Sequence, residues 1–423
     1  MPWPGNHGFG SGMHAPRQLT RSPTVDRVLK GELCSGCGLC AGVSGGAIQI
    51  QAGPPGYNRP VMSGGLAPAS ERKIAAACVG AVVEPWSGER IDPYWGPWRR
   101  VLTGHALDET IRFEGSSGGV ITGLLVHALE SGLIDGVVHV APDPDHPARN
   151  ITAISRTRTE VIARSGSRYA PSSPLEVIDD CLNSGERLAF VGKPCDVSAL
   201  RRLAKIDERV DRQFPLMISF FCGGVPSHAG AGRILSAMGL EPSEVTEFRY
   251  RGRGWPGNCV AVSPTGRGEM TYAESWGSHL SKEVQFRCKI CPDAVGGAAD
   301  IACADAWHGD EDGYPSFSEE PGRSLIVSRT AVGESLLESA LAAGVVAVQA
   351  ASIDDVERMQ PAQARRKRLV LARTAALPLT LQPRPRMAGL GVAAAARRAK
   401  PSEAIQNLVG TIRRVLQGRR SRL

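Results

Sequence analysis

Three cysteines near the start of the chain, Cys34, Cys37 and Cys40, stand at C-x2-C-x2-C spacing. Two of the four residues between them are glycines, and Gly36 and Gly38 can adopt the positive φ angles that a tight wrap requires. Thiolates held by such a loop bind metal, and this spacing is typical of iron–sulfur clusters. A zinc site more often joins one C-x2-C pair to a distant second pair. The spacing therefore favours an iron–sulfur cluster over zinc, and over thiols that merely pack in a core.

The fourth ligand of this cluster must come from elsewhere in the chain. In the bacterial ferredoxin run a fourth cysteine follows four residues after the third and precedes proline. Ser44 and Gly45 occupy those positions here. Cys78 is the nearest remaining thiol along the chain, in an alanine-rich segment. A lone cysteine in such a segment is usually a core residue, but the incomplete set before it favours Cys78 as the ligand.

Four more cysteines predict a second metal site. Cys195 and Cys222 each follow a short apolar run, while Cys288 and Cys291 form a C-x2-C pair in a turn-prone loop. If both runs are strands of one parallel sheet, their carboxyl ends meet at one edge, so the first two thiols converge there. They can then complete the half-site that the C-x2-C pair provides. The remaining thiols are interpreted as core residues: Cys181, Cys259 and Cys303.

Two loops contain residue types that suit an anionic ligand. The first, residues 115–119, consists of serine and glycine and precedes an apolar helical pattern, with Ser117 as the expected N-cap. Free N–H groups and the helix dipole at such a start favour phosphate, although an ordinary capped helix accounts for the same residues. The second loop, residues 166–171, places Arg168 beside Tyr169. That pair suits a phosphate or a flat ring, but it also occurs on ordinary protein surfaces.

Repeated strand–turn–helix units must position these residues. Apolar runs at residues 134–140, 187–192, 214–221 and 324–328 are typical of buried strands, and helical patterns stand between them. Such units build a parallel or mixed sheet with flanking helices. The expected fold class is therefore α/β with α+β character, plus a small N-terminal ferredoxin-like cluster-binding segment.

The charge of the chain is unevenly distributed. Its 423 residues have a net charge of +7, yet from Pro361 onward there are fifteen lysines and arginines and one acid, Glu403. The preceding part is net acidic, which argues against nucleic-acid binding. Apolar residues at helical spacing between 405 and 416 give the tail an amphipathic pattern. This pattern fits contact with an acidic partner or, less well, an anionic membrane surface, and it equally fits a solvated terminal helix.

The cysteine content bears on the compartment. The chain has eleven cysteines, and its first residues lack the pattern of a signal peptide. Its apolar runs are also too short to span a bilayer. Cysteines in that context point to a reducing environment and metal ligation instead of disulfides, so we expect a cytoplasmic protein.

Seven short motifs resemble, in their order along the chain, the beta-subunit family of coenzyme F420 hydrogenases and dehydrogenases, which includes the 7-hydroxymethyl chlorophyll a reductases. The motifs occupy residues 34–40, 117–120, 166–169, 192–195, 221–223, 288–291 and 299–301. Each is weak by itself, and their common order makes the resemblance specific.

The resemblance implies an oxidoreductase with FAD and one or two [4Fe–4S] clusters. Such a protein moves electrons between a two-electron donor or acceptor, a deazaflavin or another hydride carrier, and one-electron carriers. The resemblance suggests these ligands for an inner cluster: Cys195, Cys222, Cys288 and Cys291. The C-x2-C-x2-C run and Cys78 then hold an outer cluster. The candidates for holding FAD are Ser116, Ser117, Gly118, Gly119, Arg168, Tyr169 and Lys193.

The composition of the chain and this resemblance together suggest how the chain divides. The expected parts are a disordered lead-in (1–25), an iron–sulfur segment (26–100), a beta-subunit N-terminal domain (101–185), a C-terminal domain with the second cluster (186–360) and a basic tail (361–423). Expected partners are an electron-carrier protein such as ferredoxin and a small-molecule redox substrate. Because every candidate ligand precedes Pro361, we expect the tail to be dispensable for cofactor binding. A β-branched residue at Gly118 is expected to weaken FAD binding without unfolding the chain.

Two other functions remain open. Zinc or a cluster could stabilise the fold of a non-catalytic adaptor whose tail binds a partner. Alternatively, the chain could be an electron-relay subunit that has clusters but no substrate site of its own. Bound flavin with iron and sulfide distinguishes the enzyme from the adaptor, and turnover with a soluble hydride donor distinguishes it from the relay.

Overall fold

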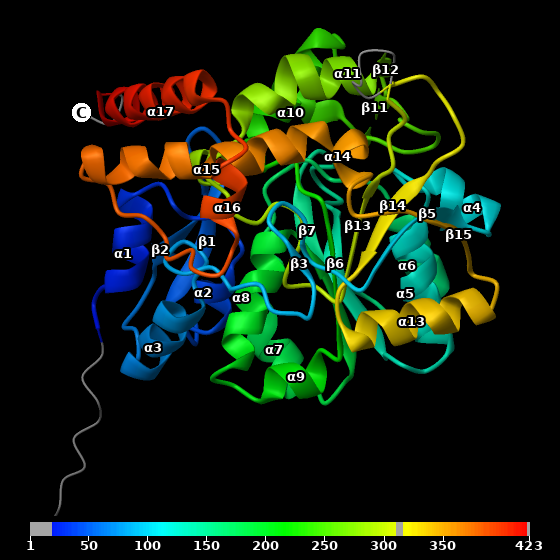
Figure 1. Ribbon diagram of the computed structural model, residues 1–423, viewed down its shortest axis with the longest axis horizontal. Coiled ribbons are helices and arrows are strands. Elements are labelled where there is room, and N and C mark those ends of the chain that lie inside the picture. Colours follow the sequence, from blue (N-terminus) through cyan, green and yellow to red (C-terminus); the bar gives the residue numbers. More distant parts are fainter. Residues whose placement is uncertain (1–18, 310–315, 421–423) are drawn as a thin grey trace, which may run out of the picture.

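The structure is a computed structural model that describes residues 19–309 and 316–420. Its centre is an eight-stranded sheet (Figure 1). The strands, in chain order, are β5 (Arg100–Ala106), β6 (Gly136–Pro142), β7 (Asn150–Ser155), β8 (Leu188–Gly192), β9 (Leu216–Phe220), β13 (Ile301–Asp305), β14 (Ser324–Ser328) and β15 (Val346–Ala350). Across the sheet they follow the order β15-β5-β14-β13-β9-β8-β6-β7.

The sheet is mixed. Four neighbouring strands, β6, β8, β9 and β13, run parallel to one another, and the other pairings in the sheet are antiparallel. The four strands expected from apolar runs correspond to β6, β8, β9 and β14. The predicted mixed α/β fold is therefore confirmed.

Helices cover both faces of this sheet. One face packs against α5 (Val120–Glu130) and α13 (Ala331–Ala342), and the other against α7 (Ile178–Asn183) and α8 (Pro194–Ala204). Side chains alternate along β9, so Leu216 and Ile218 join the first core while Met217 joins the second. Shorter helices flank the sheet: α4 (Glu109–Glu114), α6 (Arg158–Ala163) and α9 (Arg209–Gln213).

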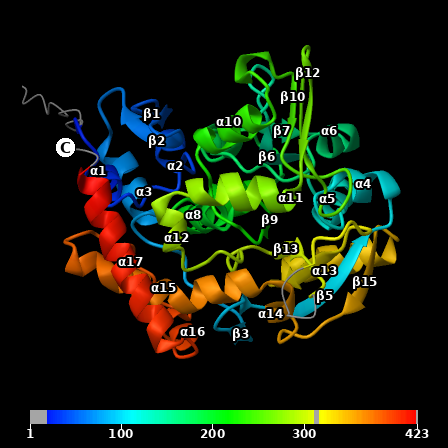
Figure 2. The ribbon, with the colours of Figure 1, turned by 90° about the horizontal axis from the view of Figure 1, so that it is seen from above.

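The N-terminal part stands beside the sheet and contains the first cysteine loop (Figure 2). Its elements are α1 (Pro23–Lys30), α2 (Leu39–Gly42), the hairpin β1 (Ile48–Gly53) with β2 (Tyr57–Met62), and α3 (Pro68–Ala77), followed by the short pair β3 (Ile91–Asp92) and β4 (Gly96–Pro97). Ser22 caps α1 and donates a hydrogen bond to Glu71 at 2.5 Å, which ties α1 to α3. Residues 1–18 of the predicted lead-in lie outside the described residues, and α1 begins inside its expected range.

A smaller antiparallel sheet lies above the carboxyl ends of the central parallel strands (Figure 1). It consists of β10 (Glu247–Arg249), β11 (Cys259–Ser263) and β12 (Gly266–Met270), and it packs with α10 (His228–Ala237). Helical turns at α11 (Tyr272–Glu274) and residues 275–283 then lead to α12 (Phe286–Lys289), which contains Cys288.

The C-terminal part is an integral layer of the fold. It consists of α14 (Val356–Met359), α15 (Pro361–Leu379), α16 (Val392–Ala396) and α17 (Pro401–Arg420). In α15, Ala364 packs with the tryptophan-rich core beside the sheet, and Leu377 packs with Val28 and Ile290. The expectation of a separate basic tail is wrong for α15, because one face of this helix, with Leu369, Val370 and Leu377, is buried. Among the described residues no helix is long and apolar enough to cross a membrane.

Candidate functional site

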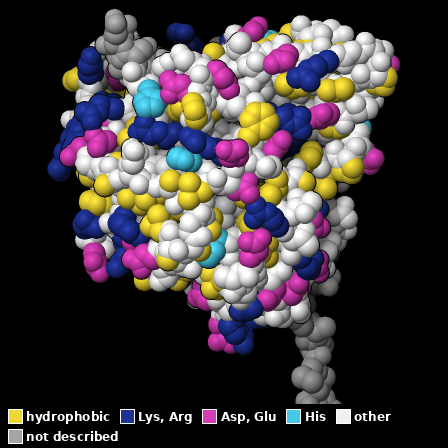
Figure 3. All heavy atoms as spheres, turned by 90° about the vertical axis from the view of Figure 1, so that its right-hand side faces the viewer, with side chains coloured by type: hydrophobic (Ala, Val, Ile, Leu, Met, Phe, Trp, Pro, Cys, Tyr) yellow, Lys and Arg dark blue, Asp and Glu magenta, His cyan; other side chains and the backbone are white. Residues whose placement is uncertain are grey.

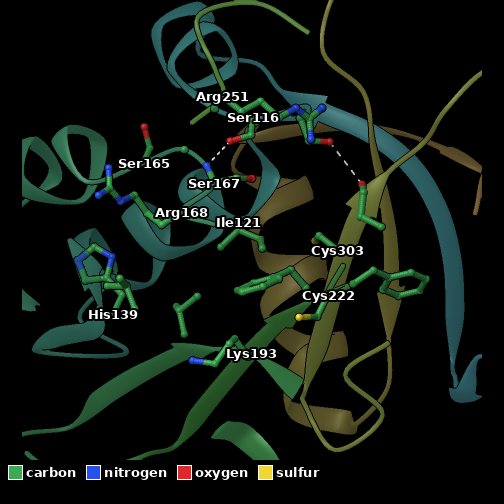
Figure 4. Close-up of a pocket in the computed structure, with 18 of the residues that line it drawn as sticks. Ser116, Ile121, His139, Ser165, Ser167, Arg168, Lys193, Cys222, Arg251 and Cys303 are labelled. Atoms are coloured by element: carbon green, nitrogen blue, oxygen red, sulfur yellow. Dashed lines mark hydrogen bonds between the residues drawn. The ribbon is translucent and has the colours of Figure 1, made fainter. Parts of the chain in front are cut away.

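A cavity of about 270 Å³ opens at the carboxyl ends of the parallel strands (Figure 4). Loops 115–121 and 164–170 form one side of it, and residues that follow β8 and β9 form the other. Cys303 to Asp305, at the end of β13, complete the lining. This is the place where open α/β sheets bind ligands, because the strand-end loops converge there.

The serine–glycine loop approaches the cavity as predicted, with one exception. Ser116, Ser117 and Gly119 line it, and Gly119 has φ +73° where α5 begins. No side chain caps the helix, so its first N–H groups remain available to a ligand. Ser117 is therefore not the N-cap; its hydroxyl contacts Arg323 O and Ser324 Oγ, each at 3.0 Å.

Gly118 faces the sheet instead of the cavity. Its N–H donates to Ser324 Oγ at 2.9 Å, and a Cβ added there would stand 2.6 Å from Gly104 O and 2.8 Å from Ser324 N. A β-branched residue would push β5 and β14 away from the loop. The prediction that such a change acts on ligand binding alone is therefore wrong.

Arg168 lines the cavity, but its guanidinium already donates hydrogen bonds to other residues of the protein. It donates to Asn150 Oδ1 at 2.9 Å and to three backbone carbonyls, those of Phe248, Pro147 and Arg149. Tyr169 beside it packs against Trp276, with ring centroids 5.0 Å apart. Arg168 therefore holds loops together, contrary to its interpretation as a free cation for phosphate.

Lys193 is buried at the end of β8 and lines the cavity (Figure 4). Its Nζ lies 2.8 Å from Asp196 Oδ2 and 2.7 Å from Ser172 Oγ. Burial would lower the pKa of this amine, but the charge of Asp196, followed by that of the Cys195 thiolate, outweighs burial and raises it. The cavity therefore has a buried Lys193–Asp196 ion pair next to the thiol of Cys195.

Several cavity residues escaped the sequence analysis. His139, on β6, contacts Ser155 Oγ at 2.7 Å, and burial, together with the charge of Arg164, lowers its pKa to about 4, so the ring is neutral at pH 7. Arg251 forms a bidentate pair with Asp305 at 2.9 and 2.7 Å. Cys303, interpreted only as a core residue, also faces the cavity. These residues lie far apart in sequence, and no local motif connects them.

The structure brings the four inner cysteines together beside the cavity. Cys222 lines it, immediately after β9. Burial raises the pKa of the Cys222 thiol to about 12, and the nearby charges of Cys288 and Cys291 add to the shift. The pKa of Cys195 is raised too, by burial and then by Asp196, with further contributions from Cys222 and Cys288. The thiols are thus close enough to interact electrostatically.

The four outer cysteines also converge. Burial raises the pKa of Cys37 to about 12 and that of Cys78 to about 11, and the charge of Cys34 contributes to both shifts. The pKa of Cys40 is raised by burial and by the charges of the other three thiols. Gly36 and Gly38 have φ values of +79° and +86°, as expected for the tight wrap.

The chemistry of both sets can be compared with that of metal sites. Among the described residues, no three His, Cys, Asp or Glu side chains form a group that could hold a single metal ion. In a [4Fe–4S] cluster each cysteine binds a different iron, so its ligands stand further apart than around one ion. Donors also point at sulfur: Val225 N lies 3.4 Å and Gln285 Nε2 lies 3.6 Å from Cys288 Sγ. These features fit a cluster.

Two residues of one short segment connect the inner and outer sets. Gln285 donates to Ser35 O at 3.2 Å, within the first cysteine loop, as well as to Cys288 Sγ. Arg287 is 3% exposed, and its Nη2 donates to Val79 O at 3.1 Å. Its charge acts on both Cys78 and Cys291, where it lowers the pKa against the larger effect of burial. The two sets are therefore neighbours.

Helix α15 holds the inner cysteine loops from outside. Arg366 Nη1 and Gln363 Nε2 donate to Cys222 O at 2.8 and 3.0 Å. Arg373 Nη1 donates to Lys289 O at 2.8 Å, and Lys367 Nζ donates to Pro292 O. The expectation that residues after Pro361 are dispensable for the site conflicts with these contacts, because both inner loops depend on them.

Comparison with known proteins gives the family. Residues 101–179 match the N-terminal family model of the coenzyme F420 hydrogenase/dehydrogenase beta subunit, and residues 185–354 match the C-terminal model. The chain belongs to this family. The resemblance inferred from the seven motifs is confirmed.

Individual relatives of this beta-subunit family member support the same family assignment. The coenzyme F420 hydrogenase subunit beta of Methanococcus voltae is 26% identical over 270 residues, which cover 62% of this chain and 88% of that protein. The chloroplastic 7-hydroxymethyl chlorophyll a reductase of Oryza sativa is 26% identical over 159 residues, 37% of this chain and 32% of that protein. A chain of the F420-reducing [NiFe] hydrogenase complex from Methanosarcina barkeri has the same fold, with a TM-score of 0.54 at 21% identity, covering 70% of this chain and 98% of that one.

The cavity lining, apart from Gln360, and the inner cysteines lie within residues 101–354, and two parts of this beta-subunit family member lie outside the matched residues. The outer cysteines precede the matched region, and α15 to α17 follow it. The contacts of Gln285, Arg287 and Arg366 therefore connect the matched region to segments on either side of it.

Proposed function

We propose that the protein is a flavin- and iron–sulfur-dependent oxidoreductase that passes electrons between a hydride donor or acceptor of the deazaflavin type and one-electron carriers. The observation that carries this proposal is the position of the 222–224 loop, which lines the cavity with Cys222 and belongs at the same time to the inner thiol set. Relatives named as F420-dependent hydrogenase, formate dehydrogenase and sulfite reductase proteins support the redox class.

The cavity residues would hold FAD from two sides. Backbone N–H groups at the start of α5, with Ser116 and Ser117, suit its phosphates. Apolar side chains such as Ile121, Leu125 and Val191 suit a flat ring. The cavity volume of about 270 Å³ is close to the lower end of ligand pockets, roughly 300–1,000 Å³. Bound FAD supplies the exchange between two-electron and one-electron chemistry.

The two cysteine sets would each hold one [4Fe–4S] cluster. Gly224 N–H and Val225 N–H lie in the loop beside Cys222 and Cys288, where they can donate to sulfur. Lys193 lies next to Cys195 and Arg287 next to Cys78, and each cation lowers the pKa of its neighbouring thiol against the larger effects of burial and, at Cys195, of Asp196. The inner set lies beside the cavity, and the outer set lies beyond it.

We also propose the wider setting expected from the sequence. Residues 26–100 form the iron–sulfur segment, and residues 101–185 and 186–360 form the two beta-subunit domains. The protein acts in the cytoplasm, where a reducing environment preserves its eleven cysteines. Its partners are a protein electron carrier such as ferredoxin and a small redox substrate.

Anaerobic purification with reconstitution tests this function. We expect about eight iron and eight sulfide per chain, the content of two [4Fe–4S] clusters, and about one FAD. The reduced deazaflavin should bleach the flavin absorption, and the clusters should then pass electrons to a viologen dye. A colourless, zinc-binding protein without flavin would support the adaptor instead. Iron without turnover by any hydride donor would support the relay.

A further inference from the structure

A second cavity, of about 380 Å³, lies on the other side of the inner cysteines. Cys288 and Lys289 line it from α12, Trp276 lines it from the preceding turn, and Arg365, Arg366 and Arg373 line it from α15. Cys222 lines the first cavity and Cys288 lines the second. The inner thiols therefore stand between the proposed flavin site and this second cavity, which we name the basic pocket.

Positive charge is concentrated around the basic pocket. Besides Lys289 and the three arginines of α15, Arg414 of α17 is close enough for its charge to act on both Lys289 and Arg373. The nearby carboxylates are Glu403, which pairs with Arg365 at 2.5 Å, and Glu283, which pairs with Arg233 at 3.0 Å. Five cations thus face two acids. On the face at the right of Figure 1, by contrast, basic and acidic side chains are interspersed (Figure 3).

We propose that the basic pocket is the docking surface for an acidic one-electron carrier protein. The proposal rests on the function proposed above, because it needs a cluster at the inner cysteines. Opposite charge steers such a partner to the pocket and orients it there. Arginine and tryptophan, the residue types of its rim, contribute strongly to protein interfaces. Cys288 in the lining brings a docked carrier next to the inner cluster.

The transfer itself balances simply. Each docking event moves one electron between the inner cluster and the carrier, with no bond made or broken. A hydride carries two electrons, so one turnover with a reduced deazaflavin needs two docking events and releases two protons to solvent, one from the hydride and one from the ring nitrogen of the donor. Four of the five cations lie on α15 and α17, beyond residue 354, where the family model ends. The docking surface is therefore largely an addition to the region that the family models match.

Charge reversal at the rim tests the proposal in the cofactor-loaded protein. The probe is a small acidic [2Fe–2S] ferredoxin, with an acidic flavodoxin as a second carrier. The variant is Arg365→Glu with Arg414→Glu, since no side-chain hydrogen bond connects either residue to the cysteine loops in the described structure. Arg212→Glu is the matched control, because Arg212 is 65% exposed and pairs with Glu208, as Arg365 is 66% exposed and pairs with Glu403.

At low salt, the double variant should raise the KM for the carrier at least tenfold and weaken its direct binding equally, while the control changes both less than twofold. Reduction of a viologen dye by the hydride donor should not change. The proposal would be overturned if the double variant reduced the dye normally and bound the carrier as tightly as the unchanged protein does. Failure of both carriers to bind, or binding of anionic lipid vesicles alone, would also overturn it. Charge-dependent carrier binding by a protein that cannot be loaded with flavin or iron would instead refute the proposed function, and the basic pocket would then be a protein-binding surface without electron transfer.

Discussion

Arg287 lies between the two cysteine sets with its side chain buried and only part of its hydrogen-bonding capacity used. Nη2 donates to Val79 O, while Nε and Nη1 have no partner among the described residues. A buried cation without a counter-charge is costly to the folded state. An anionic cluster in each cysteine set would provide that counter-charge. The buried Arg287 therefore fits a protein in which both sets hold a cluster.

We predict that Arg287→Met lowers the midpoint potentials of both clusters. Each reduction adds negative charge, and loss of the neighbouring cation makes that addition less favourable, by on the order of tens of millivolts. Arg287→Lys should recover part of the change. A redox titration followed by electron paramagnetic resonance measures both potentials. Arg156→Met, at an exposed ion pair with Glu186, should leave them unchanged. A shift confined to one cluster would contradict the position assigned to Arg287.

Single cysteine substitutions should separate the two clusters. Cys291→Ser is expected to lose about half of the iron, since one of two clusters is lost, and Cys37→Ser the other half while FAD stays bound. Cys181→Ser should keep all of the iron, because Cys181 lies on α7 and is buried in the core of the sheet domain. Iron and sulfide analysis of the reconstituted variants gives the result. If Cys303→Ser lost a cluster and Cys222→Ser kept both, the inner set would be misassigned.

The neutral ring of His139 predicts a dependence of stability on pH. Its pKa is about 4 in the folded protein and 6.5 in the reference state. Between these values the unfolded chain binds a proton that the folded chain does not, so stability falls as pH falls, by at most about 1.4 kcal/mol per pH unit. His139→Gln should therefore reduce the loss of thermal stability between pH 6.5 and 5. His146→Gln, at an exposed site, should not. An unchanged pH dependence in His139→Gln would contradict the buried neutral ring.

The site was predictable from the sequence where its signal is local. Spacing alone placed Cys34, Cys37 and Cys40 in one loop, and strand-end positions brought Cys195 and Cys222 to one edge of the sheet. The pairing of Arg251 with Asp305 and the contacts of His139 join residues that are distant in sequence. No motif with a fixed residue spacing could have predicted them. Arg168 was misinterpreted because the sequence does not show the carbonyls that occupy its guanidinium.

At the scale of elements, the main fold followed from apolar periodicity and the C-terminal part did not. Strands β6, β8 and β9 are nearly continuous apolar runs, interrupted by His139 in β6 and Ser219 in β9, as expected for strands buried on both faces. The dense basic residues of α15 are typical of a solvated tail, although Leu369, Val370 and Leu377 form a buried face. Apolar residues at helical spacing in a basic segment thus indicate packing for α15, whereas in α17 Ile405 and Leu416 remain exposed.

Removal of α15 should cost the inner cluster. A chain that ends at Gln360 loses the donors of Arg366, Lys367 and Arg373 to the inner cysteine loops and exposes the core against which α15 packs. We expect it to retain the outer cluster and to lose about half of its iron, one cluster of two. A chain that ends at Lys400 keeps α15 and α16 and should retain all of it. Full iron content in the shorter chain would show that α15 covers the loops without supporting them.

At the scale of the whole molecule, the sites form a continuous series. The first cavity, the inner cysteines and the basic pocket follow one another, and the outer cysteines adjoin the inner ones through Gln285 and Arg287. The 222–224 loop belongs to both the first cavity and the inner set, whereas no residue of the outer loop lines the first cavity. The flavin site should therefore be coupled to one cluster and not to the other.

This arrangement predicts that FAD and the inner cluster stabilise each other. A cluster fixes the 222–224 loop, so FAD should bind the loaded protein at least about 5-fold more tightly than the metal-free protein, within the usual range of coupling between sites. By reciprocity, FAD should slow the removal of inner iron by a chelator. Fluorescence quenching gives the FAD affinity, and Cys195→Ser should abolish the gain while Cys37→Ser retains it. Equal FAD affinity in all of these forms would show that the loop is already rigid without metal. The two sites would then share residues without being thermodynamically coupled.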